Sequence, residues 1–207
     1  MGSIGIIEYG MGNIQSVVNA FDYLHIPTRV VEKPKDLFLI DKIVLPGVGA
    51  FGEGMSKLKA LGFIDALQQE VIKNRRPFLG ICLGMQLICK ESFEFGHFTG
   101  LGWIDASVLK LPDDLNLRIP HVGWNNLTVK KPNRLINVSA ERKNLDVYFV
   151  HSYYVEGFNS DFTIASCNYG IEFTAIIEQD NIFATQFHPE KSQRVGLSIL
   201  KMFSEVT

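Results

Sequence analysis

The first half of the chain alternates short apolar runs with stretches whose apolar residues recur at helical spacing. Ile4 to Tyr9 is such a run, and it ends in Gly10-Met11-Gly12-Asn13, which predicts a buried strand followed by a turn. Asn13 suits a helix N-cap, because its side chain can accept a hydrogen bond from a free backbone N–H. The apolar face of the helix expected next consists of Ile14, Val17, Val18, Phe21 and Leu24. Such alternation is typical of a parallel sheet covered by helices.

The same pattern predicts the remaining elements. In the first half we expect strands at Thr28–Val31, Lys42–Leu45 and Phe78–Ile81, and helices at Phe63–Asn74 and Leu83–Glu91. From Trp103 the chain is rich in strand-like runs, at Val108–Leu111, Leu127–Val129, Asp146–Val150, Thr163–Cys167, Thr174–Glu178 and Ile182–Gln186. A helix from Ser192, its expected N-cap, to Phe203 closes the chain. We therefore expect an α/β fold with a mixed, mostly parallel sheet and helices on both faces. A chain of 207 residues fills one such domain, over residues 1–207, and is short for two.

Composition and charge exclude several classes of function. A formal net charge of −2 gives no electrostatic basis for binding nucleic acid, and no apolar run approaches the roughly 20 residues of a membrane-spanning helix. The first residues lack the basic region and cleavage site of a signal peptide. The odd cysteine count (Cys82, Cys89, Cys167) indicates a reducing cytoplasm, and we expect Cys89, on the helix after the elbow described next, and Cys167 in the core. No zinc-like Cys/His spacing or phosphate-binding glycine loop is present, so neither a metal nor a cofactor is expected.

Phe78 to Gln86 is the segment most indicative of chemistry. An apolar strand ends at Cys82, with a glycine two residues away on each side, and a helical stretch follows. This is the cysteine form of a nucleophile elbow. Gly80 and Gly84 fit because the turn is so tight that side chains there would crowd neighbouring backbone, and the helix N-terminus favours the thiolate of Cys82. Alone, the motif suits a buried structural cysteine equally well.

A nucleophilic cysteine needs a base, and the base needs a group that orients it. His188 lies in Gln186-Phe187-His188-Pro189-Glu190, directly after an expected strand. In an extended segment His188 and Glu190 point to the same side, and the proline between them favours that geometry. Glu190 can then accept from one ring nitrogen while the other nitrogen faces the thiol. Alone, the motif also fits a solvated turn; with the elbow it predicts a Cys-His-Glu relay.

A third segment, Leu45 to Phe51, places glycines at another strand end. Glycine lets a backbone N–H turn toward a ligand, as stabilising a tetrahedral oxyanion requires, and the N–H of Leu83 would be the second donor. A simple turn before a helix is the alternative, and the sequence leaves open whether a partner must bring this loop into its competent conformation.

The remaining histidines carry weaker signals. His25 and His97 have no acidic or cysteine partner in sequence, which favours surface or capping roles. His121 and His151 sit in unusual contexts, but no carboxylate follows that could orient them. None of the four is therefore predicted to act as the base.

Together these segments resemble the class I glutamine amidotransferases, and more closely the glutaminase subunits of imidazole glycerol phosphate synthases from histidine biosynthesis. The resemblance runs nearly the full length and implies a flavodoxin-like fold. The segments that carry it are Tyr9-Gly10-Met11-Gly12-Asn13, Pro46-Gly47-Val48-Gly49-Ala50-Phe51, Gly80 to Gln86, Pro120-His121-Val122-Gly123-Trp124-Asn125, Tyr148 to Tyr153 and Gln186 to Ser192. Many class I members share the elbow and His-Pro-Glu, whereas the first, second and fourth segments are far more specific to this subunit.

The resemblance implies roles for individual residues. Cys82 matches the nucleophile, His188 the general base and acid, and Glu190 the residue that orients His188. The positions that hold glutamine are Gly49, Gln86, Ser152 and Tyr153, and those of the oxyanion region are Gly47, Val48, Gly49 and Leu83.

The resemblance also implies a partner. In this family a (β/α)₈-barrel cyclase forms a heterodimer with the glutaminase, receives ammonia through its interior and makes imidazole glycerol phosphate and AICAR; its ligand activates the glutaminase. The positions at or near that interface are Asn13, His121, Trp124, Asn125, Tyr148 and Lys191. Independently of the family, Trp124 beside Asn125 in a glycine-containing loop is an aromatic anchor of the kind that interfaces favour, although a core tryptophan fits equally well.

Departures from the family pattern leave alternatives open. Glu8 stands where the family usually has aspartate, and Glu91 to Gly96 lacks the usual two adjacent acids. Paralogous glutaminases that supply ammonia for surface-polysaccharide sugar synthesis therefore remain an alternative. A cysteine peptidase or deglycase would need neither Gln86 nor Ser152-Tyr153, and the intact triad argues against a non-catalytic regulatory subunit. The glutaminase of pyridoxal phosphate synthesis usually carries a different glycine loop.

Overall fold

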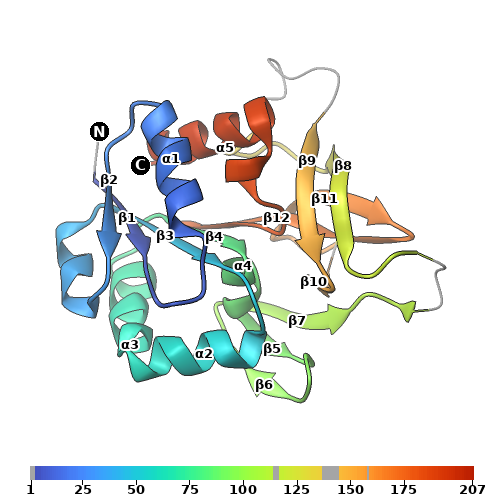
Figure 1. Cartoon of the computed structure of the whole chain (residues 1–207), viewed down its shortest axis with the longest axis horizontal. Helices are drawn as coiled ribbons and strands as arrows, with labels where there is room; N and C mark the ends of the chain where they lie inside the picture. Colours follow the sequence, from blue (N-terminus) through green and yellow to red (C-terminus); the bar gives the residue numbers. More distant parts are fainter. Residues whose placement is uncertain (1–2, 114–116, 137–144, 158) are drawn as a thin grey trace.

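The computed structural model describes residues 3–113, 117–136, 145–157 and 159–207, and the described strands join in one mixed sheet (Figure 1). Along its main path the order is β2-β1-β3-β4-β13-β12-β10-β7-β5-β6, and β11, β8 and β9 branch from β12. The parallel part consists of β1 (Ile4–Ile7), β2 (Thr28–Val31), β3 (Lys42–Gly47), β4 (Phe78–Cys82) and β13 (Ile182–Thr185). The carboxyl ends of these strands share one edge of the sheet, and Cys82 lies there.

The remaining strands pair mostly in antiparallel fashion. They are β5 (Cys89–Ser92), β6 (Phe98–Thr99), β7 (Ile104–Lys110), β8 (His121–Val129), β9 (Asp146–His151), β10 (Tyr153–Val155), β11 (Thr163–Tyr169) and β12 (Ile171–Gln179). Each strand-like run expected after Trp103 falls within or overlaps one of these strands or β13. The predicted mixed α/β sheet is confirmed.

Helices cover both faces of the parallel strands, as predicted (Figure 1). α1 (Ile14–Tyr23) and α5 (Gln193–Glu205) lie on one face, and α2 (Phe51–Ala60) and α3 (Phe63–Leu67) lie on the other. α3 continues as a π-helical segment, Gln68–Lys73, so the helix expected at Phe63–Asn74 is present with a widened second half. The large buried side chains of these layers include Phe21, Phe51, Phe63, Phe183 and Phe203.

Local capping at α1 also follows the sequence. The side-chain oxygen of Asn13 accepts a hydrogen bond from the N–H of Ser16 at 3.3 Å, as an N-cap should. Among the described residues, no helix is long and apolar enough to cross a membrane.

The predicted extent of one other helix is wrong, and at another the expected N-cap residue is in place without a side-chain capping bond. The helix expected at Leu83–Glu91 ends at Leu87 (α4, Leu83–Leu87), and Cys89–Ser92 forms β5 instead. The cause is tertiary, because pairing of β5 with β6 and β7 outweighs local helix propensity. At the start of α5, Ser192 makes no capping bond; its hydroxyl donates to the carbonyl of His188 at 2.6 Å and accepts from the N–H of Tyr148 at 2.9 Å.

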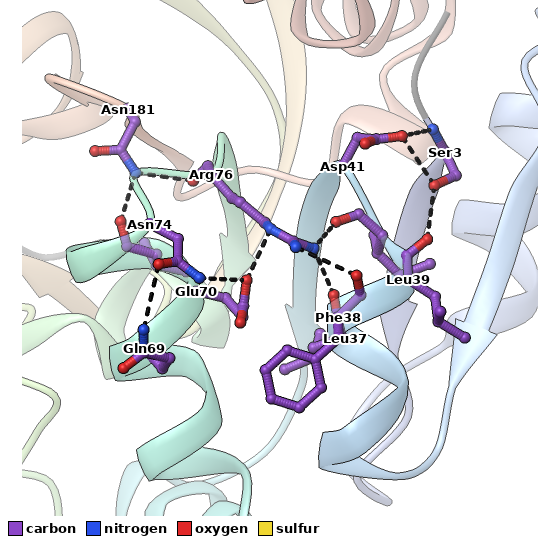
Figure 2. A network of polar contacts seen from close by, with 12 residues as sticks. Ser3, Leu37, Phe38, Leu39, Asp41, Gln69, Glu70, Asn74, Arg76 and Asn181 are labelled. Carbon is purple, nitrogen blue, oxygen red and sulfur yellow. Dashed lines mark hydrogen bonds and ion pairs between the residues drawn. The ribbon is translucent and has the colours of Figure 1, made fainter.

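An ion pair between a partly exposed arginine and a buried glutamate anchors the connection between β2 and β3 (Figure 2). Arg76 Nε lies 2.7 Å from Glu70 Oε2, and the Glu70 side chain is fully buried. The same guanidinium donates to the carbonyls of Leu37, Phe38 and Ile40 in and just after the 3₁₀ helix Pro34–Leu39. This clamp lies near the start of β4, at the edge of the sheet opposite Cys82.

Candidate functional site

Cys82 occupies a strained turn between β4 and α4. Its φ is 54° and its ψ is −107°, which is an unfavourable backbone conformation for a residue with a side chain. The flanking glycines are sterically required: a Cβ on Gly80 would lie 2.7 Å from the carbonyl oxygen of Gly84, and a Cβ on Gly84 would lie 1.9 Å from that of Leu45. The predicted reason for both glycines is confirmed. The turn holds the sulfur at the carboxyl edge of the sheet.

His188 and Glu190 form a buried pair. Nδ1 of His188 lies 2.7 Å from Oε1 of Glu190, and both side chains are almost fully buried. The expected extended backbone is only partly correct, because Pro189–Lys191 forms a short 3₁₀ helix after the extended His188. The backbone N–H of His188 donates to the carbonyl of Tyr148 at 3.0 Å, which fixes the pair against β9.

Cys82 and Glu190 together determine the charge of His188. Burial lowers the pKa of His188, but hydrogen bonding to the side chains of Cys82 and Glu190, with their charges, outweighs burial and raises the pKa to about 10. Nε2 of His188 is buried and makes no hydrogen bond among the described residues, so the interaction with Cys82 that raises the pKa is not a regular hydrogen bond in this conformation. The arrangement favours an imidazolium at neutral pH.

A cavity of about 360 Å³ opens beside Cys82, a volume suited to a small ligand. Most of the residues predicted to hold glutamine or its oxyanion line it; these are Val48, Gly49, Leu83, Gln86, Ser152 and Tyr153. Gly47 does not line the cavity. It ends β3 opposite Cys82 in register, and a Cβ there would lie 2.5 Å from the hydroxyl of Tyr9.

Gln86 links the cavity wall to the sulfur. Its amide nitrogen donates to the carbonyl of Tyr153 at 2.9 Å and to the side-chain oxygen of Gln186 at 3.1 Å. The amide nitrogen of Gln186 in turn lies 3.9 Å from the sulfur of Cys82. The predicted substrate residue Gln86 is therefore held in one orientation.

The glycine loop is not arranged as an oxyanion site in this conformation. The N–H of Val48 donates to the carbonyl of Met11 at 2.5 Å, so it is occupied. Gly49 has a φ of 103°, which glycine adopts readily and other residues do not. A peptide rotation at this loop is needed before Val48 can donate to a bound substrate.

Sequence reasoning missed Glu94 and Phe95, which also line the cavity. The carboxylate of Glu94 accepts the N–H of Phe51, the first residue of α2, at 2.6 Å. Burial raises the pKa of Glu94 and the bond to Phe51 partly opposes this. Phe95 is 84% exposed and its ring meets that of Tyr153 edge-on. The sequence signals are an acidic residue between two phenylalanines and the departure of Glu91 to Gly96 from the family pattern.

The predicted interface residues differ in exposure. Asn13 and Lys191 are exposed, and Trp124 is 49% exposed with its ring 6.0 Å from that of Tyr148. Asn125 is half-buried. His121 is 2% exposed, so it lies behind this surface and its ring does not present itself to a partner in this conformation.

The other histidines and cysteines are placed as follows. His97 has an acidic partner in space, since Nε2 lies 2.7 Å from Oε2 of Glu91, which corrects the expectation drawn from sequence neighbours. His25 follows α1, and its N–H donates to the carbonyl of Asp22. Cys89 and Cys167 are buried as expected, although Cys89 begins a strand and not a helical turn.

Comparison with known proteins gives consistent matches. The family described as Glutamine amidotransferase class-I matches residues 5–205. The chain is 46% identical to imidazole glycerol phosphate synthase subunit HisH 1 of Campylobacter jejuni, covering 98% of this chain and 100% of that one. It is 47% identical to subunit HisH of Geobacter sulfurreducens, covering 100% of both, and 40% identical to that of Bacillus subtilis, covering 98% and 96%.

Solved structures show the same fold at low sequence identity. A glutamine amidotransferase crystal structure matches with a TM-score of 0.75 at 18% identity, covering 98% of this chain and 97% of that one. PurLQS from Thermotoga maritima matches with a TM-score of 0.76 at 14% identity, covering 99% of each.

Proposed function

Because this chain belongs to the class I glutamine amidotransferase family, and within it to the HisH subunits of imidazole glycerol phosphate synthase, we propose that it hydrolyses glutamine to glutamate and ammonia. The ammonia passes to a (β/α)₈-barrel cyclase partner that makes imidazole glycerol phosphate and AICAR in histidine biosynthesis. The observation that carries the proposal is a strained Cys82 facing a substrate-sized cavity, with the buried His188–Glu190 pair acting on it.

Acyl transfer to Cys82 releases the ammonia. The thiolate attacks the side-chain amide carbon, a C–S bond forms, and the carbonyl electrons move to oxygen. Backbone N–H groups of Leu83 and the Gly47–Gly49 loop stabilise this oxyanion. His188, as imidazolium, gives its proton to the nitrogen, and the C–N bond breaks.

Hydrolysis of the thioester completes the turnover. His188, now neutral, accepts a proton from water as the hydroxyl attacks the acyl carbon. The C–S bond breaks, and glutamate leaves with the thiolate restored. Glu190 keeps Nδ1 of His188 protonated and the ring oriented throughout, since a carboxylate 2.7 Å away can only accept.

The cavity residues suit the two ends of glutamine. Gln86, Ser152 and Tyr153 offer amide and backbone groups to the polar substrate, and Gly49 allows close backbone approach. We assign Glu94 to the α-ammonium group of glutamine, because it is a carboxylate within the same cavity wall. The α-ammonium would offset the cost of burying that charge.

The partner surface is proposed from residues near the site. Asn13, Trp124 and Lys191 are its exposed members, Asn125 and Tyr148 are half-buried, and His121 lies behind them. Direct transfer to a partner matters because ammonia released into neutral water is protonated and loses its nucleophilicity. The single domain over residues 1–207 and the cytoplasmic location stay predictions.

The paralogous role in surface-polysaccharide sugar synthesis is less well supported, because the relatives described above are named as HisH subunits. The longer side chain of Glu8 folds onto its own turn, where its carboxylate accepts the N–H of Gly10 at 2.7 Å. Co-purification from the native organism, followed by identification of the barrel protein recovered, distinguishes the two partners.

Replacing the nucleophile tests the activity. Cys82→Ala should abolish glutamine-dependent synthesis by the complex, yet leave synthesis from added ammonium salt intact. Cys89→Ala is the matched control, since it removes another buried thiol without touching the cavity, and it should retain glutaminase activity. Glutamine hydrolysis by Cys82→Ala at the wild-type rate would show that the nucleophile is misassigned.

A further inference from the structure

A chain of hydrogen bonds joins strand β8 to the cavity through two histidines. Nδ1 of His151 lies 2.9 Å from the carbonyl oxygen of Tyr153, and Nε2 of His151 lies 3.0 Å from Nδ1 of His121. Nε2 of His121 lies 3.5 Å from the amide nitrogen of Asn125, which also donates to the carbonyl of Asn168 at 3.0 Å. The mechanism above uses neither histidine.

The bonding partners fix the tautomers of both rings. A carbonyl oxygen only accepts, so Nδ1 of His151 carries a hydrogen and Nε2 of a neutral His151 is an acceptor. His121 must then donate through Nδ1, which leaves its Nε2 to accept from the amide of Asn125. All donors along the chain therefore point toward the carbonyl of Tyr153.

The surroundings keep both rings neutral. His121 and His151 are 2% and 6% exposed, and burial lowers the pKa of His121 to about 4 and that of His151 to about 3. The ring of His121 stacks on that of Tyr169 at 3.8 Å and on that of Phe149 at 4.8 Å between centroids. A second proton on His151 would remove the acceptor that His121 needs.

The hydrogen-bond chain ends at Tyr153, on the wall of the cavity. The carbonyl of Tyr153 also accepts from Gln86, whose amide nitrogen donates to Gln186, and Gln186 lies 3.9 Å from the sulfur of Cys82. One carbonyl therefore receives donors from both the histidine chain and the substrate-binding glutamine.

The hydrogen-bond chain begins on the inner face of strand β8. Alternate residues of a strand point to opposite sides, so His121 and Asn125 face inward, whereas Val122 and Trp124 are 55% and 49% exposed. If contact with the outer face of β8 displaced the strand, it would also move Asn125, the first donor of the hydrogen-bond chain.

We propose that His121 and His151 are positioning residues that hold the Gln86–Tyr153 wall of the glutamine cavity in place and tie it to strand β8. This deepens the proposed function and rests on it. Without the donor from His151, the Tyr153 carbonyl loses one of the two side-chain partners that it has among the described residues, and the orientation of the Gln86 amide is less restrained.

Matched substitutions at His121 separate positioning from packing. His121→Asn keeps a donor near the place of Nδ1 but loses the stacked ring, whereas His121→Phe keeps the ring and loses the donor. A chloroketone analogue of glutamine, which must enter the cavity to alkylate Cys82, reports binding by mass spectrometry in the full chain. Iodoacetamide, which needs no such binding, reports the reactivity of the sulfur itself.

The proposal predicts that the half-saturating concentration of the chloroketone rises about tenfold in His121→Phe and less in His121→Asn, as expected for loss of one hydrogen bond. Iodoacetamide rates should stay equal in both. A larger loss in His121→Asn than in His121→Phe would assign the residue to packing and overturn the proposal.

A second measurement does not depend on activity. ¹⁵N NMR of the histidine rings in the wild type should show both His121 and His151 neutral with the hydrogen on Nδ1; the opposite tautomer on either ring would overturn the proposal. Failure of the wild-type chain to react with the chloroketone at Cys82 would instead contradict the proposed glutaminase function, so the two failures are distinguishable.

Discussion

The N–H of Val48 donates to the carbonyl of Met11, and this bond occupies a donor that the proposed chemistry needs. Loss of one oxyanion donor commonly lowers kcat by about 10²–10³. We therefore expect the isolated chain to hydrolyse glutamine at least about a hundredfold more slowly than the complex with its barrel partner. Steady-state glutamate formation with and without the partner measures this.

Alkylation provides the control for that comparison. Iodoacetamide should modify Cys82 at similar rates in both states, because displacement of iodide forms no oxyanion. Equal glutaminase rates with and without partner would contradict the role given to the Val48 bond.

The backbone at Cys82 predicts an inverted preference between glycine and alanine. Alanine normally stabilises a protein relative to glycine by about 0.5–1 kcal/mol, but at φ 54° and ψ −107° a Cβ is strained. Cys82→Gly should therefore be more stable than Cys82→Ala by about 1 kcal/mol. Denaturant unfolding of the two inactive variants tests the sign, and a more stable alanine variant would show that the turn relaxes.

Glu190 should control the protonation of His188. Burial lowers the pKa of His188, and contacts with Cys82 and Glu190 raise it to about 10 overall, so Glu190→Gln should lower it. Because the folded pKa exceeds the usual 6.5, His188 contributes stability below pH 6.5 that is lost as the pH rises toward 10. NMR titration of His188 measures the pKa, and an unchanged value in Glu190→Gln would contradict the pairing.

His121 and His151 should make the free energy of unfolding fall as the solution becomes more acidic, the opposite of the effect of His188. Their pKa values of about 4 and about 3 lie below the usual 6.5, so the unfolded chain binds protons first and stability falls as the pH drops from 6.5 toward 4. Each contributes a slope of about 1.4 kcal/mol per pH unit at most. Unfolding of His151→Phe between pH 7 and 5 should show a shallower dependence than the wild type.

Much of the fold could be predicted because its signals are local. Asn13 caps α1 through a residue three positions away, and Gly80 is required by its close approach to Gly84 across the turn. The helix predicted across Cys89 failed because the competing strand partners, β6 and β7, come later in the chain.

The candidate site could likewise be predicted only where its signals are local in the sequence. The Cys-His-Glu set could be proposed because each motif is short and distinctive. Glu94 and the His121–His151 contact could not, because their partners are distant in sequence and only the folded sheet brings them together. The hydrogen bond between Val48 and Met11 could not be predicted from the sequence either, since it depends on the conformation of a loop.

Removing the ion pair between Arg76 and Glu70 should strongly destabilise the protein. Arg76→Met would leave the fully buried Glu70 without its cation, which commonly costs about 3 kcal/mol or more. Adding Glu70→Gln should recover part of this loss, because the second change removes the unpaired charge. Thermal and denaturant unfolding of the single and double variants measure the coupling, and additive losses would contradict it.

Strand β4 begins beside the Arg76 clamp and ends at Cys82. The ion pair that stabilises the fold and the reactive thiol therefore lie at opposite ends of the same strand. Substitutions around the Arg76 clamp should therefore change the resistance of the protein to heat or solvent without changing the reactivity of the Cys82 thiol.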